Sequence, residues 1–221
     1  MPWDRHWAVI HKDTKFDTTH PEWAMCRNFM IGTSTPDLAG IWAKLDTARG
    51  SITLSHQALG QITFTPDDKA DRRRFVAWVQ DLCPADGRQP QDIVTVPNRG
   101  MTDTAYPSIS IMNTASHDAV ASAMGIALER ERWRGNIWLD GLAPWGEWGW
   151  IGQNVQIGEA VLRVREPIKR CKHTTAHPHS GRRDADTLAA LRDNWKHQNF
   201  GLYAEVIQGG KIDLGDTAEV I

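Results

Sequence analysis

Cysteine is scarce in this sequence, and the few cysteines are far apart. The 221 residues include three of them, Cys26, Cys83 and Cys171, and none has the C-x-x-C spacing. An odd number of widely spaced cysteines argues against a disulfide framework. It also argues against a zinc or iron–sulfur cage made by this chain alone. The pattern fits a protein of a reducing compartment.

Long apolar runs and an excess of basic charge are also missing. No stretch approaches about 18 consecutive apolar residues, so we expect no transmembrane helix. The first residues do not resemble a secretory signal, so we expect a cytoplasmic protein. Lysine and arginine number 25 against 27 acidic residues, giving a formal net charge of −2. Nucleic acid is therefore not expected as the main partner.

The composition is that of an ordinary globular protein, except that tryptophan is abundant. Hydrophobic residues make up 41% and charged residues 24%, which allows a sizeable core. Several of the 11 tryptophans cluster between Trp133 and Trp150. Aromatic side chains mostly serve burial, so we favour packing in a core and its rim. The alternative is the wall of a pocket for a flat ligand.

Hydrophobic periodicity, capping residues and turn residues predict more strands than helices. There is no regular β-α-β alternation, which argues against a Rossmann fold. We predict a mainly β protein with covering α-helices (α+β), built as a closed barrel or a sandwich. The predicted strands are 4–10, 51–56, 61–65, 92–97, 108–112, 136–139, 155–157, 160–164, 202–208, 211–213 and 217–221. The predicted helices are 36–45, 72–82, 117–124 with Ser116 as N-cap and Gly125 as C-cap, and one capped by Asp184 or Asp186.

A turn is predicted late in the chain. Gly209 and Gly210 separate two of the predicted strands, 202–208 and 211–213. Two glycines between short strands are a signal for a two-residue hairpin. We therefore expect these two strands to pair with each other.

Cys171 has the most chemically suggestive surroundings of the three cysteines. Lys169, Arg170 and Lys172 lie within two residues of it, and nearby cations favour the thiolate form of a cysteine. A thiolate acts as a nucleophile, a redox group or a soft-metal ligand. The alternative is a buried cysteine that acts as a small apolar side chain. The charged flanks favour the reactive interpretation.

A second candidate site contains alternating arginines. If this stretch is extended, Arg132 and Arg134 lie on one face of the chain as it enters a strand. Two arginines can then grip an anion, and the amide of Asn136 can bind the edge of a heterocycle. The alternative is a pair of surface ion pairs with Glu129 and Glu131.

Three histidines follow Cys171, namely His173, His177 and His179. Together with the cysteine they raise the alternative of a zinc site. Their spacing runs across a proline-containing loop and no second cysteine is near, so solvated loop histidines are favoured. A Cys-His hydrolase dyad is disfavoured as well, because no family signature surrounds the cysteine.

Taken together, these stretches resemble the MOSC family, which is named for the C-terminal domain of molybdenum cofactor sulfurases. The family includes the mitochondrial amidoxime-reducing component and bacterial hydroxylaminopurine reductases. The resemblance covers essentially the whole chain and is most specific from residue 130 onward. The matching segments are Asp4–Val9, Arg134–Gly141, Arg170–Thr175 followed by Pro178 and Gly181, Asp186–Leu191, Phe200–Val206 and Gly209–Asp216.

The resemblance implies a closed β-barrel that binds a molybdopterin-type molybdenum cofactor. It implies a MOSC-associated β-rich segment at residues 1–100 and a MOSC core domain at 101–221. By the same resemblance, Cys171 supplies a thiolate to the metal, and a small molecule is the substrate. The other implied cofactor-binding residues are Arg134 and Asn136 at the pterin-phosphate, Arg170 beside the thiolate, Arg5 at the phosphate, and Asp103 and Thr104 in a pterin-contacting loop.

One departure from the family pattern concerns the start of the chain. Family members usually begin with a strand that carries a lysine-containing motif for the cofactor phosphate, and this sequence starts downstream of it. Loss of a barrel strand would expose a sheet edge and remove one phosphate contact. The expectation is either a true start further upstream or weak cofactor binding.

The function implied by the resemblance is reduction of N-hydroxylated compounds by a molybdenum oxidoreductase. No iron–sulfur or flavin motif is visible, so a separate electron-donor protein must supply the electrons. The alternative is a carrier of sulfur, as a persulfide on Cys171, or of molybdenum cofactor. The pyridoxal-phosphate domain of the sulfurases is absent from this sequence, so pyridoxal phosphate is not expected and a sulfur donor would be separate. A catalytically silent domain is the third alternative.

Overall fold

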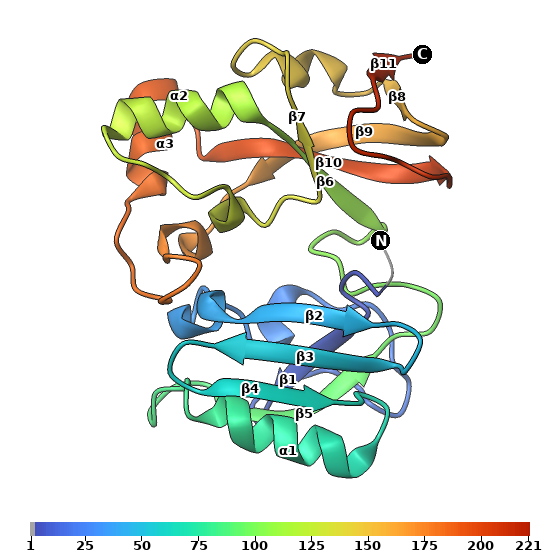
Figure 1. Ribbon diagram of the computed structural model, residues 1–221, viewed down its shortest axis with the longest axis vertical. Helices are drawn as coiled ribbons and strands as arrows, with labels where there is room; N and C mark the ends of the chain where they lie inside the picture. The colour runs from blue at the N-terminus through green and yellow to red at the C-terminus, as the bar shows by residue number, and fades with distance from the viewer. Residues whose placement is uncertain (1–2) are drawn as a thin grey trace. The chain divides into compact units, whose positions relative to one another are not determined.

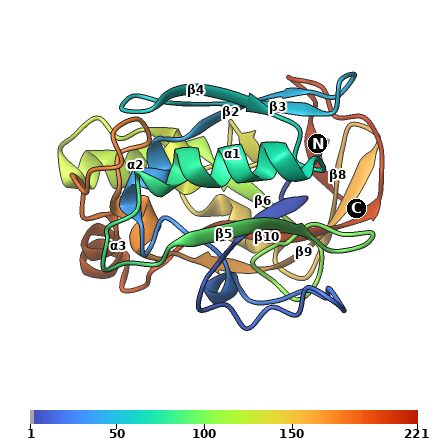
Figure 2. The same ribbon diagram turned by 90° about the horizontal axis from the view of Figure 1, so that it is seen from below.

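The computed structural model describes residues 3–221 and divides into two compact units. The first unit contains the chain up to Ala105 together with Ala176–Ala185. The second unit contains Tyr106–Thr175 and Asp186–Ile221. The chain therefore leaves the second unit after Thr175 and returns to it at Asp186. Figures 1 and 2 show the two units, which are described separately below.

The first unit consists of two small antiparallel sheets and one α-helix. β1 pairs with β5, and β2, β3 and β4 form a three-stranded meander. Helix α1 lies beside β5 and packs on this unit's core (Figure 2). The bounds are β1 Trp7–His11, β2 Trp42–Asp46, β3 Ser51–His56, β4 Gly60–Phe64, α1 Lys69–Gln80 and β5 Pro90–Thr95.

The sequence pattern explains how this core forms. Helical spacing places Phe75 and Val79 on the buried face of α1, and Phe75 stacks on Phe64 with ring centroids 4.9 Å apart. The side chain of Asp68 caps the helix by accepting a hydrogen bond from the Asp71 backbone N–H at 2.8 Å. The strands expected around Gly60 and the helix expected over 72–82 are both confirmed.

The helix expected at 36–45 is wrong over its second half. Only Pro36–Gly40 is helical, as a short 3₁₀ turn, and the chain then forms strand β2. β2 pairs with β3 from Trp42 opposite Ser55 onward, so backbone hydrogen bonds to β3 outweigh a weak helical pattern. Trp42 and Leu45 remain about two-fifths exposed and do not form the buried helical face that the spacing predicted.

The second unit is a strongly curved sheet with two α-helices. Its order is β11-β8-β9-β10-β6-β7, antiparallel throughout except for the parallel pair β6–β7. Helices α2 and α3 pack on each other. The bounds are β6 Ser108–Asn113, α2 Thr114–Met124, β7 Ile137–Leu139, β8 Asn154–Ile157, β9 Ala160–Lys169, α3 Thr187–Trp195, β10 Asn199–Gln208 and β11 Ala218–Val220.

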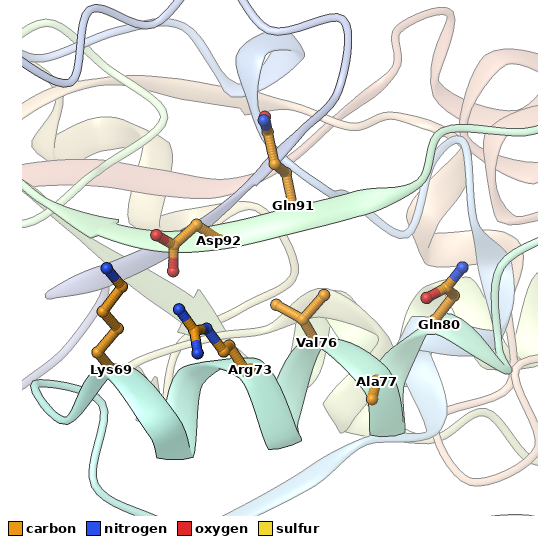
Figure 3. A pocket seen from close by; sticks show the side chains of 7 residues that line it. All are labelled: Lys69, Arg73, Val76, Ala77, Gln80, Gln91 and Asp92. Atoms are coloured by element: carbon orange, nitrogen blue, oxygen red, sulfur yellow. The ribbon is translucent and has the colours of Figure 1, made fainter.

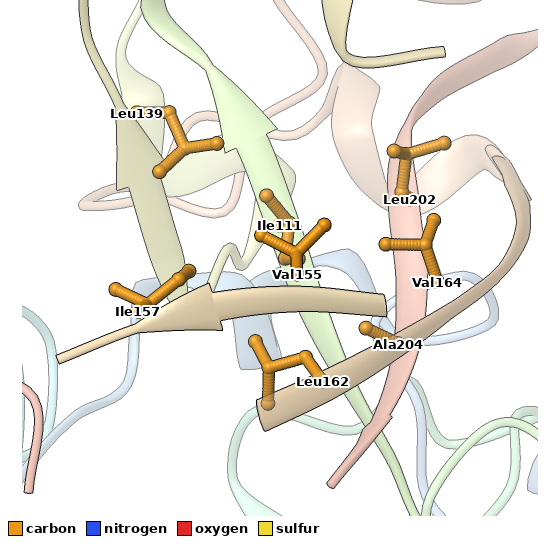
Figure 4. Packing of buried hydrophobic residues seen from close by; sticks show 8 residues of the cluster. All are labelled: Ile111, Leu139, Val155, Ile157, Leu162, Val164, Leu202 and Ala204. Carbon is orange, nitrogen blue, oxygen red and sulfur yellow. The ribbon is translucent and has the colours of Figure 1, made fainter. Parts of the chain in front are cut away.

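A single apolar core lies inside the curve of this sheet. Leu139 of edge strand β7 and Val155 of β8 belong to the same buried cluster, so the two sides of the sheet curl toward one interior. Figure 4 shows the cluster side chains converging. The architecture is mixed α/β with a six-stranded half-barrel; among the residues described, no closed barrel is formed, so that expectation is not confirmed. The cluster consists of Ile111, Leu139, Val155, Ile157, Leu162, Val164, Leu202 and Ala204.

Two turn and cap predictions in this unit are wrong. Asn113 caps α2 in place of Ser116, because the Asn113 side chain accepts from the Ala115 backbone N–H at 2.9 Å. The segment 211–213 is not a strand, so Gly209 and Gly210 do not form a hairpin. At Gly210, an added Cβ would lie 2.5 Å from the Glu159 backbone, so the chain passes close to the β8–β9 turn. That path places β11 against β8.

Other expected features are confirmed. Gly125 ends α2 in the left-handed conformation with φ 66°, and Asp186 caps α3 through a 2.9 Å hydrogen bond from the Ala189 backbone N–H. Trp133 is fully buried and stacks on Phe200 with centroids 3.9 Å apart. Packing is therefore the confirmed role of Trp133 among the clustered tryptophans.

Candidate functional site

Cys171 lies in an anchored turn at the end of a long strand. β9 ends at Lys169, and a 3₁₀ turn over Lys172–Thr175 follows the cysteine. Thr174 donates to the Cys171 carbonyl from its backbone N–H and its Oγ1, both at 3.2 Å. The Thr174 hydroxyl also pairs with that of Thr187, the first residue of α3, at 2.7 Å. The Cys171 residue itself is exposed, so the alternative of a buried apolar cysteine does not hold.

Arg170, directly before the cysteine, is directed toward the interior of the second unit. Its Nε donates to the Phe200 carbonyl at 2.8 Å and its Nη1 to the Trp133 carbonyl at 2.8 Å. Its Nη2 lies 3.2 Å from the Met112 Sδ. Gln198 bonds the Arg170 backbone twice, by accepting from its N–H and donating to its carbonyl. Arg170 therefore connects the end of β9 to β6, to the start of β10 and to the 3₁₀ turn that ends at Trp133.

Arg134 stands at the end of the short 3₁₀ turn Arg130–Trp133. It is exposed and adopts a left-handed backbone conformation with φ 53°. Arg132 is instead buried, with its side chain 2% exposed and its Nε 2.6 Å from Glu129 Oε2. The expectation that Arg132 and Arg134 share one face of an extended chain is therefore wrong. A 3₁₀ turn has about three residues per turn, so it does not alternate side chains as a strand does.

The backbone conformation of Arg134 makes a testable prediction about strain. A non-glycine residue in the left-handed region costs about 1–2 kcal/mol. Arg134→Gly should therefore exceed Arg134→Ala in unfolding free energy by about 1 kcal/mol, because both lose the guanidinium but only glycine relieves the strain. Urea unfolding of the two variants measures the difference. Equal stabilities would contradict a strained backbone at this position.

Asn136 secures the start of β7 to its neighbour β6. Its Oδ1 accepts from the Ser110 backbone N–H and from the Ser110 Oγ, both at 2.9 Å. Its own backbone N–H donates to the Ser110 Oγ at 3.0 Å. These three hydrogen bonds hold the segment from Arg134 to Asn136 on the edge of the half-barrel.

The remaining candidates lie together in the first unit. Arg5 has φ 52°, and its Nη2 lies 2.6 Å from Asp4 Oδ2. Its carbonyl accepts from the Met101 backbone N–H at 2.7 Å, which places Arg5 beside the loop that carries Asp103 and Thr104. The candidates therefore form two groups, Arg5 with Asp103 and Thr104 in the first unit, and Arg134, Asn136, Arg170 and Cys171 in the second.

The histidines after Cys171 are divided between the units. His173 belongs to the second unit, and His177 and His179 belong to the segment that clusters with the first. His179 stacks on Trp42 at 4.9 Å, and its backbone N–H donates to His177 Nδ1 at 3.2 Å. Over residues 3–221, no group of three or more histidine, cysteine, aspartate or glutamate side chains could hold a metal ion.

A groove of about 270 Å³ lies elsewhere, between α1 and β5 of the first unit (Figure 3). None of the candidate site residues lines it. The neighbouring Arg72 forms an ion pair with Asp92 at 3.0 Å. The groove is lined by Lys69, Arg73, Val76, Ala77, Gln80, Gln91 and Asp92.

Sequence reasoning missed the acceptors that hold Arg170. Phe200 lies in a segment that resembles the family, but nothing there indicates that its carbonyl accepts from Arg170, and Met112 lies in no recognisable motif. Strand pairing of β6 and β10 brings the two residues together. It also missed Glu147, a carboxyl group with 0% exposure. Nothing in the local sequence indicates these contacts or this burial, because they are made by distant parts of the chain.

Comparison with known proteins identifies the family. The MOSC domain model matches residues 102–219, more than half of the chain. The chain is similar to the crystal structure of YiiM from Escherichia coli, with 22% identity and a TM-score of 0.36. That similarity covers 51% of this chain and 53% of YiiM, about half of each. No curated protein matches. None of the helices in the described part is long and apolar enough to cross a membrane. The chain belongs to the MOSC domain family.

Proposed function

We propose that the chain binds a molybdenum cofactor of the molybdopterin type and reduces N-hydroxylated small molecules. Cys171 is the protein's thiolate ligand to the metal in this proposal. The observation that carries it is the exposed cysteine on a turn that is anchored to α3 and lies directly after Arg170. Arg170 is in turn bonded to the carbonyl of Trp133, the residue before Arg134. The Cys171 turn and the exposed residue Arg134 are thus connected through the side chain of Arg170.

The residues present fit such a cofactor better than a bare metal ion. The described part of the chain offers no cluster of three or more ligating side chains, so it has no cage for an ion alone. A cofactor of this type would bring further metal ligands of its own, so one thiolate from the protein would be sufficient. A soft thiolate suits such a metal.

Other residues would hold the organic part of the cofactor. Arg134 is an exposed residue, and a guanidinium is the fork that binds phosphate in bidentate fashion. Asn136 would keep the Arg134 segment in register through its bonds to Ser110. In the first unit, Arg5, Asp103 and Thr104 are the proposed further contacts.

The bound cofactor would supply the two-electron redox chemistry of the reaction. Reduction of a hydroxylamine to an amine takes two electrons and two protons and releases water. The electrons would come from a separate electron-donor protein. The protein's own residues bind and orient, as is usual for cofactor enzymes. Cys171 donates its thiolate, and Arg134 binds the anionic end of the cofactor.

The decisive experiment compares two exposed cysteines. Cys171→Ala should retain less than a tenth of the wild-type molybdenum after expression in cells that make the cofactor, and should lose reduction of a model hydroxylamine. Cys26→Ala is the matched control, because Cys26 is exposed too but lies in the first unit. It should behave as wild type. Unchanged turnover in Cys171→Ala would reject the proposal.

A second candidate function is a sulfur or cofactor carrier. It is favoured by the exposure of Cys171, which would let a separate sulfur donor reach the thiol. The test is to treat the purified protein with cyanide and to measure the sulfur released. Release of sulfur from the wild type but not from Cys171→Ala, in protein that retains no molybdenum, would favour this function over the reductase.

A further inference from the structure

The guanidinium of Arg170 lies in the middle of the second unit's packing. Each of its three nitrogens donates to an interior atom: the Phe200 carbonyl, the Trp133 carbonyl and the Met112 Sδ. It also lies 5.6 Å from the ring centroid of Trp133 and 5.8 Å from that of Phe200. These two rings stack on each other, so the cation faces a pair of aromatic rings as well as two carbonyls.

The place that Arg170 occupies depends on two glycines. A Cβ on Gly135 would lie 2.5 Å from the Met112 Cγ, and a Cβ on Gly201 would meet the Met112 Sδ. Only glycine at both positions leaves room for the Met112 thioether beneath the guanidinium. Gly135 lies between Arg134 and Asn136, so the segment with these two candidate residues depends on the same close contact with Met112.

The backbone of Arg170 is held as firmly as its side chain. Gln198 accepts from the Arg170 N–H at 2.8 Å and donates to its carbonyl at 2.7 Å. Cys171 therefore follows a residue whose backbone N–H and carbonyl are both hydrogen-bonded. The flanking Lys169 and Lys172 are exposed by contrast.

We infer that Arg170 is a positioning residue and not a contact to the cofactor. Its fork joins the carbonyl before Arg134 to the start of β10, and so fixes the Arg134 turn and the Cys171 turn in one arrangement. This role rests on the proposed function only in taking Cys171 as the ligand. A guanidinium is a planar fork with fixed donor directions, whereas a lysine ammonium is a point charge. Lysine would keep the charge and lose the geometry.

The first test measures local fixation in protein without added cofactor, by hydrogen exchange. The Arg134 N–H donates to the Glu131 carbonyl at 3.0 Å, and the Thr174 N–H donates to the Cys171 carbonyl at 3.2 Å. In Arg170→Lys and in Arg170→Met, peptides over 130–136 and 170–175 should both exchange at least tenfold faster. Unchanged exchange in Arg170→Lys would overturn the inference.

Two controls separate local fixation from general destabilisation. Arg165→Lys changes an exposed arginine of β9, the strand that ends directly before Arg170. Arg165 pairs with Glu205 at 3.3 Å, and its replacement should leave both peptides unchanged. Val155→Ala opens the fully buried core and lowers overall stability. When exchange rates are compared at the same free energy of unfolding, Val155→Ala should not accelerate exchange in peptides 130–136 and 170–175 more than in other peptides. If Val155→Ala accelerates exchange in these two peptides as much as the Arg170 variants do, Arg170 has only a general structural role. That result would overturn the inference.

The second test measures molybdenum content after expression with the cofactor. Both Arg170→Lys and Arg170→Met should retain less than a tenth of the wild-type metal, and Arg165→Lys should retain all of it. If Arg170→Lys retains half or more of the wild-type molybdenum while Arg170→Met loses it, the positive charge at this position acts directly on the cofactor. That result would overturn the inference. If Cys171→Ala keeps its molybdenum, the proposed function fails. Hydrogen exchange then decides the role of Arg170 by itself.

Discussion

Gly201→Ala is expected to lower the free energy of unfolding by about 3 kcal/mol, from backbone strain and overpacking together. Gly201 has φ 73°, a left-handed conformation that costs an alanine about 1–2 kcal/mol. The new Cβ would also meet the Met112 Sδ and lie 2.8 Å from the Ile111 carbonyl oxygen. Met112 is fully buried, and the carbonyl belongs to paired strand β6, so neither can move cheaply.

Urea unfolding of Gly201→Ala measures this loss, and a second glycine of the same unit provides the control. At Gly209 an added Cβ would meet no atom within 4 Å, and the backbone there is not left-handed. Gly209→Ala should therefore change stability by less than about 0.5 kcal/mol, as surface substitutions usually do. A Gly201→Ala variant within about 1 kcal/mol of wild type would contradict the prediction, because backbone strain alone accounts for about 1–2 kcal/mol.

Glu147→Ala is expected to cost about 3 kcal/mol, because it leaves buried donors without their acceptor. Glu147 has 0% exposure, and its Oε2 accepts from Asn113 Nδ2 at 2.7 Å. Ser116 Oγ donates to Oε1 at 3.1 Å and itself accepts from the Trp145 N–H at 2.8 Å. The carboxyl group therefore ties the Trp145 loop to the first turn of α2, and alanine would remove that tie and open a cavity.

The same carboxyl group makes stability depend on pH in a defined direction. Burial raises the pKa of Glu147 above the ordinary value of 4.5, although hydrogen bonds from Asn113 and Ser116 partly oppose the rise. A raised folded-state pKa means that the folded protein holds the proton more tightly than the unfolded chain does. The stabilising contribution is complete below pH 4.5 and is lost as the pH rises through the folded-state pKa.

Glu147→Gln removes this titration while keeping the side chain's size and an acceptor oxygen. The free energy of unfolding of Glu147→Gln minus that of the wild type should therefore increase as the pH rises above 4.5. Urea unfolding at a series of pH values measures the difference. Glu131→Gln, at an exposed glutamate of the same unit, serves as the control for the exchange of a glutamate for a glutamine. A Glu147→Gln profile parallel to wild type would contradict the raised pKa.

The candidate site divides arginines of similar sequence context into different roles. Arg132 is buried against Glu129, Arg134 is exposed at a left-handed turn, and Arg170 is turned inward. A sequence motif records only that an arginine is present. For Arg170, the direction of the guanidinium is set by acceptors far away in the chain, namely the carbonyls of Trp133 and Phe200 and the Met112 Sδ.

Local signals were sufficient for several elements and for the family. The β3–β4 pair, helix α1 and the cap at Asp186 follow from alternation, helical spacing and capping chemistry, which act within a few residues. The order and spacing of the segments around Arg134 and Cys171 resembled the MOSC family, and the family match over residues 102–219 confirms it. Prediction failed at 36–45, where pairing of β2 with the next strand β3 decided the structure, and at Gly209–Gly210, where the chain passes the β8–β9 turn and β11 pairs with β8.

By itself, the sequence determined the family, most of the strands and the candidate thiol at Cys171. Only the tertiary structure decided that Arg170 points inward, that Glu147 is fully buried, and that the segment Ala176–Ala185 clusters with the first unit. The physical reason is the same in each case. A short-range pattern specifies backbone conformation, whereas the direction and burial of a side chain depend on acceptors and apolar surfaces contributed by residues far along the chain.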